Sequence, residues 1–153
     1  MSPAGMEARP FHNLPRIQQV ECSGTSLDAD TTVSSMILYD SSETIIASVN
    51  TLTGECMTQA SFSSCLLHKA DTRRTKLRTL AMDLEEGESR TYGCEVTSLR
   101  SGERAKIITW SLTVRAVSKQ RVCLDRPRRC LLVVYSNTYG CLVTGKKRMR
   151  SRV

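Results

Sequence analysis

Alternation of apolar and polar residues is the strongest pattern in the chain, and it is clearest in IITWSLTVR, residues 107–115. Four apolar residues stand there at every second position: Ile108, Trp110, Leu112 and Val114. A strand with one buried and one exposed face has this period of two, whereas a helix would spread the same residues around all its sides. We therefore predict a β-strand with these four residues in the core.

A second alternating segment, RTYGCEVTS, lies just before this strand. Three of its residues share one face: Tyr92, Cys94 and Val96. The polar stretch between the two segments, residues 99–106, has the composition of a turn around Ser101 and Gly102. The pattern therefore predicts an antiparallel hairpin, which would be the last hairpin of the domain.

Shorter strand-like segments precede this hairpin, separated by stretches rich in Gly, Asp, Ser and Thr. Their ranges are 16–22, 33–40, 43–52 and 75–82. Two of them have a predicted common face, made by Ile45, Ala47 and Val49 in one and by Leu77, Thr79 and Ala81 in the other. Residues 53–74 show no clear pattern. Because no helical stripe is sustained and no internal repeat is present, the segments favour an all-β sandwich.

Composition divides the chain into three parts. Residues 1–15 hold three of the four prolines and show no period, so we predict a flexible arm there. Residues 119–153 hold ten Lys or Arg against one acidic residue, a net charge of +9. The whole chain carries +7, so residues 1–118 carry −2, and the predicted domain at 16–118 is not itself basic. The basic balance therefore gives little reason to expect that the domain binds nucleic acid.

The basic segment 119–153 is predicted to be an extension and not a domain. Its runs RPRRC and GKKRMRSRV could bind phosphates or sulfated polymers through salt-sensitive charge. Few aromatic residues are interleaved with these charges, only Tyr135 and Tyr139. The charge of these runs still gives the chain an alternative function, that of a small basic protein that binds nucleic acid or another polyanion through this tail.

Cysteine usage points to an oxidising compartment. Seven cysteines are present, four of them within the first 118 residues. An even set of four within one domain is typical of disulfide-bonded extracellular proteins. Four cysteines allow three pairings, and the residues alone do not choose among them. The other three cysteines lie in the tail: Cys123, Cys130 and Cys141.

The sequence shows no signal that would direct the chain to this compartment. The N-terminal residues contain no apolar run of the length that a secretory signal needs, and no stretch approaches the ~20 apolar residues of a membrane span. We therefore expect a fragment, or the product of an incomplete gene model, that lacks its true N-terminus, acts outside the cell and has no membrane span.

Catalytic and metal-binding patterns are weak. His68 lies three residues after Cys65, a spacing that a thiol and its base could use, but a structural cysteine beside a surface histidine is the simpler interpretation. The three tail cysteines lack both the short ligand spacing and the histidine of a zinc module. We therefore predict no enzymatic activity, no metal site and no cofactor.

The combination DLEEGESRTYGCEVTS and ITWSLTVR resembles the last two strands of an immunoglobulin-superfamily domain. In that family a tyrosine two residues before the second core cysteine forms the tyrosine corner. The matching residues here are Tyr92 and Cys94. The resemblance implies that Cys22 is the first core cysteine and pairs with Cys94, which leaves Cys56 and Cys65 as a second pair.

The resemblance also implies the fold. We expect an all-β, immunoglobulin-like antiparallel β-sandwich over residues 16–118, with a disordered N-terminal arm and a basic C-terminal tail. The tryptophan that the family packs against its core disulfide is missing, so Ile37 or Leu38 would fill that space. The Tyr92 hydroxyl is expected to bond the backbone near residues 83–86.

The segment EEGESRTYGCEVTSLRSGERAKIITWSLTV is also similar to immunoglobulin-like domains of molluscan fibrinogen-related proteins, which are secreted lectins. This resemblance implies a non-enzymatic recognition or adhesion module in innate immunity. Its partners would be a protein or glycan ligand and further domains of a parent protein. We predict that the loop 99–106 contacts the ligand through Arg100, Glu103 and Arg104.

Overall fold

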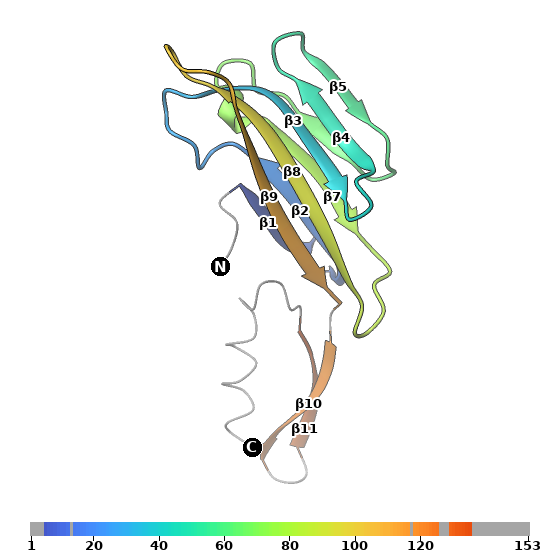
Figure 1. Ribbon diagram of the computed structural model, residues 1–153. Helices are drawn as coiled ribbons and strands as arrows, with labels where there is room; N and C mark the ends of the chain where they lie inside the picture. The colour runs from blue at the N-terminus through green and yellow to red at the C-terminus, as the bar shows by residue number, and fades with distance from the viewer. Residues whose placement is uncertain (1–4, 13, 117, 126–128, 136–153) are drawn as a thin grey trace.

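The computed structural model of the chain describes residues 5–12, 14–116, 118–125 and 129–135, and its regular elements are almost all strands (Figure 1). One antiparallel sheet has four strands in the order β1 (Met6–Phe11), β2 (Leu14–Ser23), β7 (Lys76–Ala81) and β6 (Ser64–Leu66). The other has five, in the order β5 (Glu55–Thr58), β4 (Ile45–Asn50), β3 (Thr32–Asp40), β8 (Ser89–Leu99) and β9 (Lys106–Arg115). This order matches that of a variable-type immunoglobulin sandwich. The predicted all-β sandwich is confirmed.

The core lies between the two sheets and is built from the inward positions of each strand. Tyr92, Cys94 and Val96 of β8 are all buried, as the alternation predicts. Leu38 of β3 lies opposite Cys94 in the ladder and has no exposed surface, whereas its neighbour Ile37 is only partly buried on the outer face. Leucine therefore occupies the place beside the core disulfide where the resemblance would put tryptophan.

Strand β9 is less buried than its alternation predicts. Leu112 and Val114 are buried, but Ile108 and Trp110 are only partly so. The reason is that β9 forms the edge of its sheet, so its inward side chains have a neighbouring strand on one side alone. The Trp110 ring lies against Gly5, where an added Cβ would overlap it.

The N-terminal segment differs from the predicted flexible arm at residues 1–15. Met6–Phe11 form β1, which pairs antiparallel with β2, and Met6 is 3% exposed. The chain reverses at His12, which has a left-handed φ of 49°, and the ladder is irregular beside Pro10. Proline is tolerated there because β1 is an edge strand, so the domain begins earlier than residue 16.

Two disulfides join the sheets, and both are pairs that the sequence analysis favours. Cys22 of β2 bonds Cys94 of β8 across the core, with 6.3 Å between the Cα atoms. Cys56 of β5 bonds Cys65 of β6 with the same Cα separation. Because β5 and β6 are edge strands of different sheets, the second disulfide closes one side of the sandwich.

The described part of the tail contains a β-hairpin. The strands β10 (Ser118–Asp125) and β11 (Arg129–Tyr135) pair with each other in a separate two-stranded sheet. The prediction of a non-domain tail over 119–153 overlooked this hairpin, because its strands carry no clean alternation. The run GKKRMRSRV and Cys141 lie outside the described residues.

Candidate ligand-binding loops at one end of the sandwich

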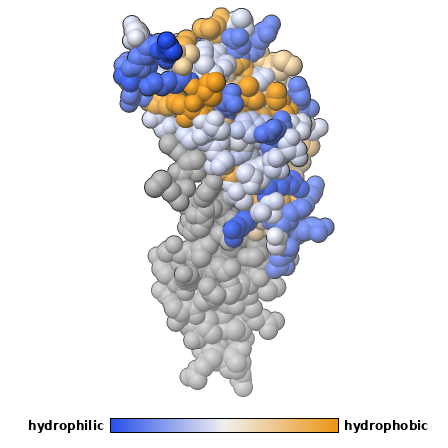
Figure 2. Space-filling model, viewed as in Figure 1, coloured by the Kyte–Doolittle hydropathy of each residue, from blue (hydrophilic) through white to orange (hydrophobic). Residues whose placement is uncertain are grey.

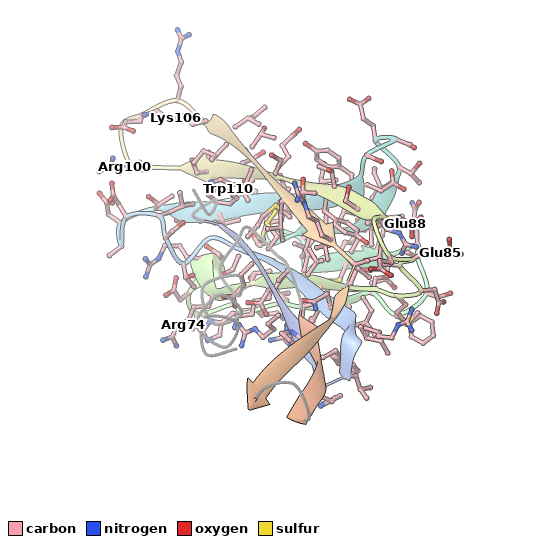
Figure 3. The ribbon with its side chains drawn as sticks, turned by 90° about the horizontal axis from the view of Figure 1, so that it is seen from below. Arg74, Glu85, Glu88, Arg100, Lys106 and Trp110 are labelled. Carbon is pink, nitrogen blue, oxygen red and sulfur yellow. A yellow bond between two sulfur atoms is a disulfide. The ribbon has the colours of Figure 1, made fainter. Side chains whose placement is uncertain are left out.

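Loops from both sheets meet at the end of the sandwich where β2 leads into β3. They are residues 24–31 between β2 and β3, 67–75 between β6 and β7, and 100–105 between β8 and β9. Figure 1 shows them gathered at the upper left of the molecule. Figure 3 shows Arg74, Arg100 and Lys106 at this end, whereas Glu85 and Glu88 lie at the opposite end. We call these three segments the loop end.

Arg100 joins two of these loops. One guanidinium nitrogen lies 2.9 Å from the Asp30 carboxylate and the other lies 3.4 Å from Asp28. The hydrogen bond from Arg100 lowers the pKa of Asp30 below its ordinary value, and the same bond raises the pKa of Arg100. Since these groups are exposed, the pairs orient the loops and add little to the stability of the fold.

Arg73 is the second connection between loops. Its guanidinium donates to the Leu27 carbonyl at 2.9 Å and to both carboxylate oxygens of Asp71, at 3.2 and 3.1 Å. Asp71 also accepts from the backbone N–H of Arg73 and so caps the short 3₁₀ helix η1 (Thr72–Arg74). The hydrogen bond from the Arg73 side chain lowers the pKa of Asp71.

Backbone groups complete the connection between residues 67–75 and the start of β3. The Gly24 N–H donates to the Arg73 carbonyl at 3.0 Å, and the Val33 N–H donates to the Thr72 hydroxyl at 2.9 Å. Within the loop itself, the hydroxyl of the buried Thr75 accepts from the His68 N–H. The loop end is therefore held in one arrangement by its own hydrogen bonds.

The three predicted contact residues have different roles in this arrangement. Arg100 is occupied by Asp28 and Asp30, so it positions the loop. Glu103 lies 3.7 Å from the Lys106 ammonium group. Arg104 is exposed, and among the described residues it has no ion-pair partner. Arg104 is consequently the charge that this loop offers most freely to a ligand.

The outer face of the five-stranded sheet is a second candidate surface. Its ladder places Met57, Ile37 and Thr109 in one row, with Ser48 and Glu95 between them. Ile107 of β9 and Met57 of β5 are 65% and 54% exposed. Figure 2 shows apolar side chains gathered in a band across this face. Exposed apolar side chains on one sheet face often mark a contact site, but here polar residues such as Ser48 and Glu95 separate them, so this face is a weaker candidate than the loop end.

Tyr92 occupies the predicted position inside β8, but its hydroxyl has other neighbours than expected. Burial raises the pKa of Tyr92, while the nearby Arg90 guanidinium and its hydrogen bond oppose that rise. Among the described hydrogen bonds there is none from Tyr92 to the backbone of residues 83–86, where the tyrosine-corner comparison places it. Arg90, two residues before Tyr92 in β8, is therefore the cation that acts on the phenol.

The alternative interpretation of Cys65 and His68 as a catalytic thiol and its base is wrong. Cys65 is bonded to Cys56, so it has no free thiol. The His68 Nδ1 accepts from the Asp71 N–H at 3.0 Å, which makes the imidazole part of the loop structure. Within the part of the chain that the structure describes, no group of three or more His, Cys, Asp or Glu side chains could hold a metal ion.

Comparison with protein-family models gives no match for this chain, and comparison with curated proteins gives no significant match. Among the described residues, no helix is long and apolar enough to cross a membrane. The two disulfides fit a protein that folds in an oxidising compartment.

Proposed function

We propose that this chain carries a non-enzymatic recognition or adhesion module of the immunoglobulin superfamily. The module would act outside the cell as part of a larger secreted lectin in innate immune recognition, with a protein or glycan as its ligand. The observation that carries this proposal is the loop end, where loops from both sheets are bonded to one another above a sandwich that two disulfides hold together.

The physical argument for binding at the loop end is preorganisation. Loops on a rigid scaffold carry contacts, and loops that are already ordered lose less conformational entropy when a ligand binds. Arg73 and Arg100 order two of these loops against residues 24–31. The loop end is therefore better suited to binding than a set of independent loops would be.

The charges of the loop end favour a ligand that offers hydrogen-bond acceptors or negative charge. Arg74 and Lys106 have side chains that are each 66% exposed, and Arg104 is exposed as well. The acids nearby are Asp28, Asp30, Asp71 and Glu103. Arg100 and Arg73 engage the three aspartates, Arg74 also lies 4.0 Å from Asp71, and Glu103 pairs with Lys106. Among the described residues Arg104 has no acidic partner, and glycan hydroxyls and protein carboxylates are both suitable partners for its guanidinium.

A binding screen with a matched pair of variants tests this proposal. The full chain is applied to a panel of immobilised glycans and to a panel of purified ectodomains. Arg104→Glu should abolish binding to any hit, whereas Arg115→Glu, an equal charge reversal at the other end of β9, should leave binding unchanged. Equal losses from both variants, or from neither, would place the contact away from the loop end.

The segregated charge of residues 119–153 favours a second candidate, which is polyanion binding by the tail. Such binding weakens steeply with salt because it depends on counterion release. A full-length variant with alanine at Lys146, Lys147 and Arg148 should then lose affinity for heparin-like polymers. Loop-end recognition predicts that this variant binds its glycan or protein ligand as the wild type does.

A further inference from the structure

The register of the hairpin β10–β11 places two cysteines directly opposite each other. Cys123 of β10 is paired with Cys130 of β11 in an antiparallel ladder. In any antiparallel pair, directly opposite residues lie on the same face, with Cα atoms about 4.5 or about 5.5 Å apart. A disulfide requires a Cα separation of about 4.4–6.8 Å, so either kind of opposite pair meets this requirement.

A second observation concerns the other cysteines of the described residues. All four of them are in disulfides, Cys22 with Cys94 and Cys56 with Cys65. A protein that forms two such bonds folds where thiols are oxidised, and close cysteine pairs do not remain reduced there. We propose that Cys123 and Cys130 form a third disulfide, which cross-links β10 and β11 and leaves Cys141 as the odd cysteine.

The reaction is ordinary thiol–disulfide exchange. The thiolate of one cysteine attacks a disulfide oxidant such as glutathione disulfide and forms a mixed disulfide, releasing one glutathione thiolate. The thiolate of the second cysteine then attacks the protein sulfur of that mixed disulfide. A second glutathione thiolate leaves, so the two cysteines are oxidised by two electrons and the oxidant is reduced to two glutathione molecules.

The cross-link has a structural purpose in this hairpin. An isolated two-stranded ribbon is only marginally stable in water, and three strands or a covering element are usually needed. In the described residues β10 and β11 pair with each other and with no strand of the sandwich. A disulfide between opposite residues would limit separation of the two strands without a third strand.

Non-reducing peptide mapping of the full chain tests this proposal. The protein is refolded in a glutathione redox buffer, its free thiols are alkylated under denaturing conditions, and it is digested with trypsin and chymotrypsin. Cleavage after Tyr135 separates Cys130 from Cys141. The expected product links the peptide of Cys123 to the peptide of Cys130. Alkylation of both cysteines, or a bond from either to Cys141, would overturn the proposal.

The variant Cys141→Ser supplies the control. It removes the odd cysteine and leaves the proposed pair intact, so the refolded variant should contain no alkylated cysteine and should still give the linked peptide. If Cys123 and Cys130 both become alkylated in this variant, the bond between them does not form on its own and the proposal fails.

Discussion

At the scale of single residues, the contact between Tyr39 and Gly93 explains why a glycine stands inside a long strand. The two residues are opposite each other in the ladder between β3 and β8. A Cβ on Gly93 would overlap the far edge of the Tyr39 ring. The ring therefore covers a position that has no side chain of its own, which is also why Gly93 is buried on an outer face.

This contact predicts that the effect of Gly93→Ala on the free energy of unfolding changes sign when the Tyr39 ring is removed. Gly93→Ala should lower the free energy of unfolding by about 1–3 kcal/mol, because the Tyr39 ring must move from its packed position. In a Tyr39→Ala background the same substitution should raise stability by about 0.4–1 kcal/mol, because alanine restricts the unfolded chain. Urea unfolding of the four proteins measures both values. Equal effects of Gly93→Ala in the two backgrounds would contradict the packing account.

Asp71 provides a second prediction at this scale, in the acid range. Its pKa lies below the ordinary 3.8 because Arg73 stabilises the carboxylate. A group with a lowered folded pKa contributes stability above its unfolded pKa and loses it as the pH falls through the folded pKa. Carboxyl titration by NMR should give Asp71 a midpoint below 3.8 that rises in Arg73→Gln. An unchanged midpoint in that variant would show that Arg73 does not act on Asp71.

At the scale of elements, the two disulfides close very different lengths of chain. Cys22 and Cys94 are 72 residues apart, and Cys56 and Cys65 are 9 apart. The chain-entropy estimate assigns about 4 kcal/mol to the longer loop and about 2.5 kcal/mol to the shorter. The longer one is also in the core, where both cysteines are fully buried, so its removal disturbs packing as well.

Paired alanine variants test this difference between the disulfides. Replacing Cys22 and Cys94 together should destabilise the chain more than replacing Cys56 and Cys65, and the second variant should stay folded. Denaturant unfolding followed by tryptophan fluorescence compares them, since Trp110 is the single tryptophan. The account would be wrong if loss of the edge disulfide were the more damaging change.

The elements also show what local sequence patterns can and cannot predict. The alternation over β7, β8 and β9 locates these strands because each has one face in the core. The strands β5 and β6 have four and three residues, and every residue of β5 is exposed, so no buried face marks it. The bond from Arg100 to Asp30 joins residues 70 apart, which no local pattern contains. The contact loop could therefore be proposed from sequence, but not its partner loops.

For the molecule as a whole, binding at the loop end requires that its three loops behave as one unit. The loops at this end come from both sheets, and the disulfides hold those sheets together. Hydrogen bonds between loops then pass any disturbance in one loop to its neighbour. Arg73 is the best place to test this, because its guanidinium lies in residues 67–75 and bonds the Leu27 carbonyl.

Amide hydrogen exchange in the full chain, compared between wild type and Arg73→Gln, shows whether the loops of the loop end are coupled. We predict faster exchange in both 67–75 and 24–31, because the bond to Leu27 is lost. Exchange in the turn of residues 82–88, at the opposite end, should remain unchanged. Faster exchange confined to 67–75, with residues 24–31 as slow as in the wild type, would contradict the account.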